Sequence, residues 1–84
     1  MLFEGKMFMF NVVIKVCDRK ELADEVQHVL TDYGKDIILR FGMPVPNNNN
    51  NCGIINLIHS GNDFNKMIDK LDEIDGISVK YVEI

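Results

Sequence analysis

The sequence predicts an α+β domain in which two helices cover one face of a four-stranded antiparallel sheet. The 84 residues have room for one small core. The apolar pattern switches between alternation and helical spacing in the order β-α-β-β-α-β. Each β-α-β crossover should be right-handed, and the middle strands should pair as an antiparallel hairpin. The ferredoxin-like arrangement satisfies these rules, with strand order 4-1-3-2. We expect an N-terminal extension, residues 1–6, and a single domain, residues 7–84.

The first strand is expected over residues 7–16, "MFMFNVVIKV". Its inward face carries only apolar side chains, namely Phe8, Phe10, Val12, Ile14 and Val16. A helix over residues 18–33 should follow, because Asp18 and Glu21 have capping-box spacing and apolar residues then recur along one stripe. Gly34 is expected to end this helix in the left-handed conformation.

The second and third strands are expected over residues 36–45 and 53–60. In "DIILRFGMPV" we expect Ile37, Leu39 and Phe41 on one side, with the prolines ending the strand. In "GIINLIHS" both faces carry apolar residues, as in a strand inside a sheet. The connection contains five asparagines and is too long for a tight turn. We interpret it as a spacer; a binding loop is the alternative.

A second helix should begin at "SGND", where Ser60 and Asp63 again have capping-box spacing. Its buried stripe is expected to consist of Phe64, Met67, Ile68, Leu71 and Ile74. After the Asp75-Gly76 turn, the alternation of "ISVKYVEI" predicts the closing strand.

Composition excludes several classes of protein. The net charge is −4, and the acids are spread among the lysines, so no basic stripe for direct nucleic-acid binding exists. No apolar stretch is long enough to span a bilayer, and no signal peptide is visible, so we expect a cytoplasmic protein with no membrane partner. No P-loop, nucleophile elbow or dinucleotide fingerprint appears. We therefore expect no enzymatic activity and no cofactor.

Three segments carry a resemblance to a known family: "DYGKDIILRFGMP", "GIINLI" and the closing "IDGISVK". Their order and spacing resemble the iron-only hydrogenase system regulator family, over about residues 10–82. The resemblance implies an ACT-like fold, similar to the C-terminal domain of nickel-responsive repressors, and a regulatory role as a dimer or larger oligomer. It implies no catalytic residues. The chain departs from the nickel repressors because His28 and His59 stand in no paired motif and no ribbon-helix-helix segment is expected.

The two cysteines are the candidate chemistry. In the predicted topology, Cys17 and Cys52 lie at the same end of the sheet. They could form a two-thiolate metal or redox site, or be two unrelated thiols at strand ends. His59 should lie at the opposite end, too far to complete such a site within one chain. The surface position expected for His28 suggests a solvated side chain.

The sheet face that the helices leave uncovered is the candidate interface. We expect it to carry apolar side chains interspersed with polar ones, namely Met7, Met9, Asn11, Val13, Ile38, Arg40, Asn56, Lys80 and Val82. The third strand is apolar on both faces, so whether Ile54 and Ile58 belong to this face stays open. On the order of 500 Å² of apolar surface would be near the limit for a monomer, whereas a homodimer buries ~800 Å² per partner. The sequence therefore predicts a non-catalytic regulatory domain that acts as a homo-oligomer, a dimer or tetramer, and contacts a protein partner or small ligand. The alternative is a thiol-dependent metal carrier using Cys17 and Cys52.

Overall fold

The computed structural model describes residues 9–17, 19–45 and 52–84 of the chain. Its elements are β1 (Phe10–Val16), α1 (Arg19–Asp32), the 3₁₀ helix η1 (Gly34–Asp36), β2 (Ile37–Pro44), β3 (Gly53–His59), α2 (Phe64–Asp72) and β4 (Ile77–Glu83). Apart from the short η1, this is the predicted order. The expected extension, the Asp18 cap and the asparagine run lie outside the described residues.

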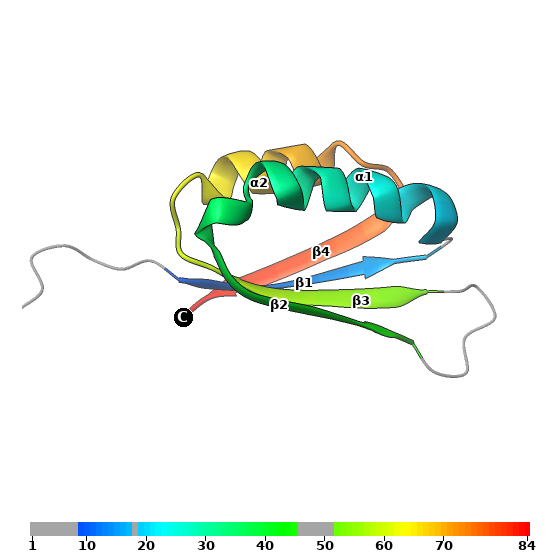
Figure 1. Cartoon of the computed structure of the whole chain (residues 1–84), viewed down its shortest axis with the longest axis horizontal. Helices are drawn as coiled ribbons and strands as arrows, with labels where there is room; N and C mark the ends of the chain where they lie inside the picture. The colour runs from blue at the N-terminus through cyan, green and yellow to red at the C-terminus, as the bar shows by residue number, and fades with distance from the viewer. Residues whose placement is uncertain (1–8, 18, 46–51) are drawn as a thin grey trace, which may run out of the picture.

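The sheet has the strand order β2-β3-β1-β4, which is the predicted 4-1-3-2 read from the other edge. All three pairings are antiparallel. Figure 1 shows α1 and α2 together on one side of the sheet. The ferredoxin-like, ACT-like fold is therefore confirmed.

The core lies between this helix layer and the sheet. It consists of buried apolar residues of β1, α1, β3 and α2: Val12, Ile14, Val16, Val26, Leu30, Leu57, Phe64, Met67, Ile68 and Leu71. At one end, the rings of Phe10 and Phe64 stack with centroids 3.8 Å apart and planes only 4° from parallel. The alternation of β1 and the stripe of α2 from Phe64 to Leu71 are thus as predicted, whereas Ile74 lies beyond α2 and is only partly buried. Phe8 lies outside the described residues.

Two helix ends differ from the prediction. Gly34 does not take a left-handed conformation; instead it begins η1, and the left-handed glycines of the described residues are Gly61 and Gly76. Asp63 has a φ of 57° and forms no side-chain cap bond, so the capping box expected with Ser60 is absent. In α2 the hydrophobic stripe, rather than the cap, sets where the helix begins.

The facing of β2 is the main correction. Ile37 pairs with His59 and Leu39 with Ile58, so Ile38 is the extra residue of a β-bulge. Beyond the bulge the alternation is reversed, because side chains directly opposite one another share a face. Leu39 and Phe41, expected to face the helices, therefore lie on the uncovered face, and Arg40 lies on the helix side.

Candidate functional site

The uncovered side of the sheet, which we call the open face, carries twelve side chains in three rows across β2, β3, β1 and β4. The rows are Leu39–Ile58–Asn11–Val82, Phe41–Asn56–Val13–Lys80 and Met43–Ile54–Lys15–Ser78. The buried residues of β1 fix which face this is, because Val12, Ile14 and Val16 pack under the helices. Their neighbours in the strand must point the other way.

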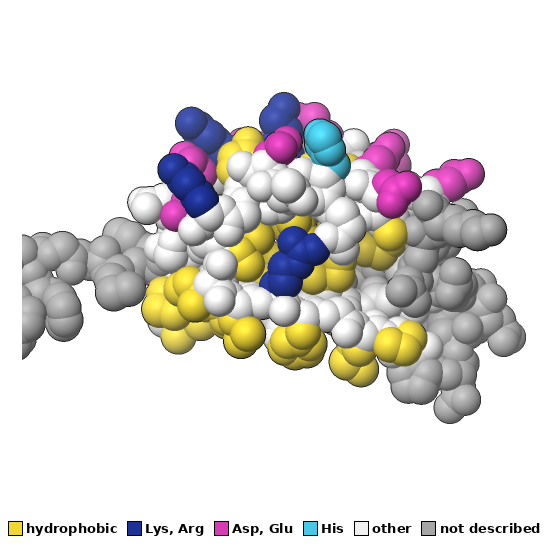
Figure 2. All heavy atoms as spheres, viewed as in Figure 1, with side chains coloured by type: hydrophobic (Ala, Val, Ile, Leu, Met, Phe, Trp, Pro, Cys, Tyr) yellow, Lys and Arg dark blue, Asp and Glu magenta, His cyan; other side chains and the backbone are white. Residues whose placement is uncertain are grey.

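Seven of these side chains form an apolar patch: Val13, Leu39, Phe41, Met43, Ile54, Ile58 and Val82. On β2, Leu39 is 57% exposed, Phe41 53% and Met43 48%. Such exposures leave on the order of 500 Å² of apolar surface, at the upper end of what monomers show. Figure 2 shows apolar side chains in a row beneath the sheet, while the charged side chains gather over the helices. Five of the eight large apolar side chains that are exposed among the described residues thus lie in this patch.

A hydrogen-bonded pair of amides lies in the middle of the open face. The Asn56 Nδ2 atom donates to Asn11 Oδ1 at 2.6 Å and to the Val12 carbonyl at 2.8 Å. The pair is partly buried, with Phe41 beside it on β2 and Val82 beside it on β4. Polar groups within an apolar contact surface limit the ways in which a partner can dock.

The structure places the predicted interface residues in four ways. Those that lie on the open face as expected are Asn11, Val13, Asn56 and Val82. Met9 precedes β1, and its carbonyl accepts from the Ile84 amide at 2.7 Å, whereas Met7 lies outside the described residues. Ile38 is the 58% exposed residue of the bulge. Arg40 was wrongly assigned to this face, because it reaches toward α1 and donates to the Gln27 side chain.

Sequence reasoning missed three members of the patch, Leu39, Phe41 and Met43. A signal was available, since Arg40 and Gly42 alternate with them and make poor core residues. Assigning Arg40 and Gly42 to the helix side of the strand would have put the three apolar side chains on the open face.

The two cysteines meet, as the topology allowed. Cys17 and Cys52 form a disulfide beyond the last β1–β3 pair, Val16 and Gly53. Cys52 is buried, and its carbonyl accepts from the Val45 amide at 3.0 Å. The reading as two unrelated thiols is therefore wrong. Among the residues described, no cluster of three or more His, Cys, Asp or Glu side chains could hold a metal.

His59 lies at the other end of β3, as expected, but inside the core. Its side chain is fully buried, Nδ1 accepts from the Gly61 amide at 3.0 Å, and Nε2 has no hydrogen-bond partner among the described residues. Burial lowers the pKa of His59, and the negative charges of Asp36 and Asp63 oppose that shift only in part. His28, in contrast, is an exposed side chain 3.8 Å from Asp32.

These features define a small ACT-like domain with an uncovered apolar sheet face. A family model described as "TM1266-like: Iron-only hydrogenase system regulator, putative" matches residues 6–81. The chain belongs to this family. It is similar to the solved structure of the uncharacterized protein TM1266 from Thermotoga maritima, with 31% identity and a TM-score of 0.78, over 90% of this chain and 95% of that one.

Two more distant structures share the fold alone. An unknown protein from Galdieria sulphuraria is 11% identical, with a TM-score of 0.67 over 100% of this chain and 53% of that one. The ligand-free regulatory subunit of aspartate kinase from Thermus thermophilus is 12% identical, with a TM-score of 0.64 over 93% of this chain and 52% of that one. No curated protein matches the chain. None of the described helices has the length and apolar character needed to cross a membrane.

Proposed function

We propose that this chain is a non-catalytic regulatory domain of the iron-only hydrogenase system, and that it acts in the cytoplasm as a homo-oligomer joined through the open face. The family supports the regulatory role. The fold shared with the regulatory subunit of an aspartate kinase is in keeping with it. The apolar patch is the observation that carries the proposal, because its exposure on a monomer is unfavourable.

The arrangement of the open face suits a second copy of the same chain. Four strands spaced about 4.8 Å apart, each rising about 3.3 Å per residue, make a face about 19 Å by 23 Å. The flat area of such a face is about 440 Å², about half of the ~800 Å² that each partner contributes to an ordinary dimer, and side chains standing off the sheet add to it. Lys15 and Lys80 lie toward the β4 side, whereas Leu39, Phe41 and Met43 lie on β2.

A two-fold axis near Phe41 and Asn56 would therefore pack the apolar halves of two open faces together. Such packing would leave Lys15 and Lys80 at the rim, where water solvates them. An apolar centre with a charged rim is the usual anatomy of a protein interface. The Asn11–Asn56 pair would lie near the centre and restrict the register of the two copies.

The test is genetic complementation in a host with an iron-only hydrogenase. Deleting the gene for this chain should change the amount or activity of the hydrogenase, and the wild-type gene should restore it. A Phe41→Lys variant, which puts a charge in the apolar patch, should fail to restore it. The matched control is Asn65→Lys, which adds the same charge at an exposed position of α2 and should complement fully. An amount and activity of the hydrogenase that stay the same after the deletion would contradict the proposal.

A second candidate function, thiol-dependent metal binding, is supported by the meeting of Cys17 and Cys52. In a reducing cytoplasm the pair would be two thiols, and thiolates are the ligands that copper(I) and zinc prefer. Metal analysis of protein purified under anaerobic, reducing conditions separates the two functions. Stoichiometric metal that is absent from a Cys17→Ala/Cys52→Ala variant supports metal binding, and sub-stoichiometric metal that the variant retains excludes it.

A further inference from the structure

A cavity lies on the helix side of the sheet, between α1 and the β2–β3 hairpin. Its volume is about 190 Å³, and its lining includes Val16, Ala23, Gln27, Gly42, Gly53 and Ile55. The space exists because three of these positions have at most a methyl group as a side chain: Gly42 on β2, Gly53 on β3 and Ala23 on α1. All of β2 beyond Ile37 is exposed, so the helix layer leaves this edge of the sheet partly uncovered.

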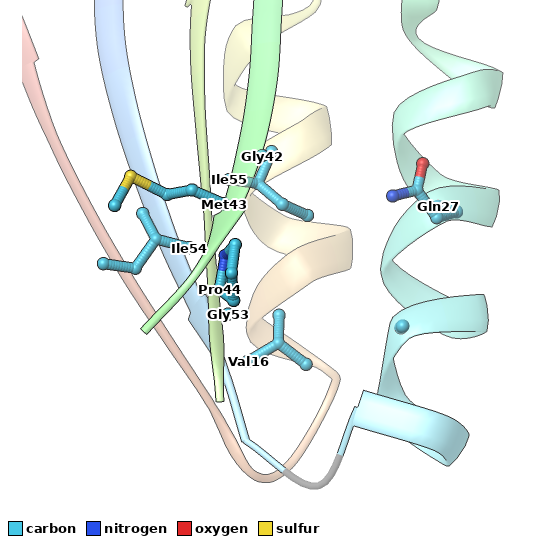
Figure 3. A pocket seen from close by; sticks show the side chains of 9 residues that line it. Val16, Gln27, Gly42, Met43, Pro44, Gly53, Ile54 and Ile55 are labelled. Carbon is cyan, nitrogen blue, oxygen red and sulfur yellow. The ribbon is translucent and has the colours of Figure 1, made fainter. Parts of the chain in front are cut away.

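The close-up in Figure 3 shows how the cavity is built. Val16 and Ile55 point from β1 and β3 toward α1, and Gln27 points from α1 toward the strands. Met43 and Ile54 point to the opposite side of the sheet, where they belong to the apolar patch. The cavity and the open face therefore lie on opposite sides of the same two strands, and they share Met43 and Ile54, which also line the cavity.

Gly42 is not required by the backbone. A Cβ atom there would meet the Ile54 carbonyl oxygen at 3.5 Å and Ile55 Cγ1 at 3.9 Å, which are ordinary contacts, and its φ is not left-handed. Glycine inside a strand weakens the strand, and it often marks a site where a ligand approaches closely. The residue at this position therefore keeps space open without serving the fold.

Arg40 supplies a charge beside this space. It lies on the same side of β2 as Gly42, two residues earlier, and it donates to the Oε1 atom of Gln27, which lines the cavity. A guanidinium has five N–H donors, and in the described part of the chain no carboxylate lies within 4.0 Å of this one. Arginine binds carboxylates through two parallel hydrogen bonds.

We propose that the cavity binds a small monocarboxylate with a compact apolar body. The body would lie under Ala23 against Gly42, Gly53 and Ile55, and the carboxylate would pair with Arg40. An apolar cavity of about 150 Å³ holds benzene, so this one suits a ligand of about six to nine non-hydrogen atoms. Among the described residues, the cavity lining contains no acidic side chain to pair with an ammonium group, so a simple acid fits better than an amino acid. The inference rests on the proposed function, in which such a ligand is the effector of a regulatory domain.

The experiment is an NMR titration of the whole chain with benzoate and with 3-methylbutanoate, each compared with its neutral amide of the same shape. We expect one of the acids to bind saturably. The chemical shifts of the backbone N–H groups should change mainly at residues 23–27, 40–44 and 53–55. The matching amide should bind about 10- to 100-fold more weakly, because it lacks the charge-assisted bonds to Arg40.

Two variants test whether the ligand binds in this cavity. Gly42→Val fills the cavity with a side chain that the backbone accepts, so the fold should persist while binding is lost. Arg40→Gln should weaken binding of the acid about 10- to 100-fold and leave binding of the amide unchanged. Saturable binding that Gly42→Val does not disturb, or no saturation by either acid up to about 10 mM, would overturn the inference. Sedimentation of the same samples separates the two proposals, because a cavity that binds nothing leaves self-association through the open face unchanged.

Discussion

Reduction of the Cys17–Cys52 disulfide should destabilise the domain substantially. The bond joins residues 35 positions apart, so it closes a loop that contains α1, β2 and the β2–β3 connection. The closed loop reduces the number of conformations that the unfolded chain can adopt. Breaking the bond frees the unfolded state and shifts the equilibrium away from the fold.

The size of the effect follows from the loop length. The chain-entropy relation for a loop of 35 residues gives about 3.8 kcal/mol at 25 °C, and native disulfides typically contribute about 2–4 kcal/mol. A domain of 84 residues has a total free energy of unfolding of about 4–13 kcal/mol. Reduction should therefore remove a large share of the stability. It should leave the hydrophobic core between sheet and helices intact, because Cys52 lies at its end.

Urea unfolding followed by circular dichroism measures the change. With a slope of about 1 kcal/mol/M for a protein of this size, reductant should lower the midpoint by about 2–4 M. The control is the Cys17→Ala/Cys52→Ala variant, whose midpoint should lie near that of the reduced protein and should not respond to reductant. Oxidised and reduced protein that unfold within about 0.5 M of one another would refute the loop-closure reasoning.

Three further predictions concern His59, Gly76 and Asn56. Burial lowers the pKa of His59 in the folded state, so the contribution of His59 to the free energy of unfolding is fully present above the unfolded pKa near 6.5 and is lost as the pH falls toward the folded pKa. In thermal unfolding measured at a series of pH values, His59→Leu should therefore reduce the loss of stability below about pH 6.5. Gly76→Ala should cost about 1–2 kcal/mol in urea unfolding, because φ is +95° and the new Cβ would lie 2.9 Å from Leu22 Cδ1, whereas Gly42→Ala should be close to neutral. Asn56→Leu should strengthen self-association but yield several oligomeric species in place of one in light scattering, because it removes the polar pair that restricts register; a single unchanged species would count against that role.

Most of the fold could be predicted from the sequence, because in most elements the hydrophobic pattern indicates a single type of secondary structure. β1 alternates cleanly, so its register with β3 and β4 carried the correct facing to Asn11, Val13, Asn56 and Val82. The end of the sheet at which the cysteines meet followed from topology alone.

The facing of β2 was predicted wrongly, although Arg40 and Gly42 at alternate positions carried a signal for the observed facing. "IILRFGMP" is apolar at nearly every position, so the rule that apolar residues face the core chose Leu39 and Phe41. That rule assumes a monomer with one buried side, whereas β2 is an edge strand that the helices cover poorly. The bulge at Ile38 reverses the alternation, and no turn residue or proline near this position predicts a bulge. The cavity was missed for a related reason, since the space above Gly42 appears only when Gly53 and Ala23 are placed around it.

Sedimentation velocity of the wild-type chain and of Phe41→Lys tests the central claim most directly. Truncating a buried interfacial aromatic costs about 2 kcal/mol or more, and a two-fold dimer contains two copies, so the variant should associate about 1000-fold more weakly. We expect the wild type at about 100 µM to sediment at twice the chain mass of 9.6 kDa or more, and the variant to sediment as a folded monomer. A wild-type chain that sediments at 9.6 kDa at this concentration would contradict the account.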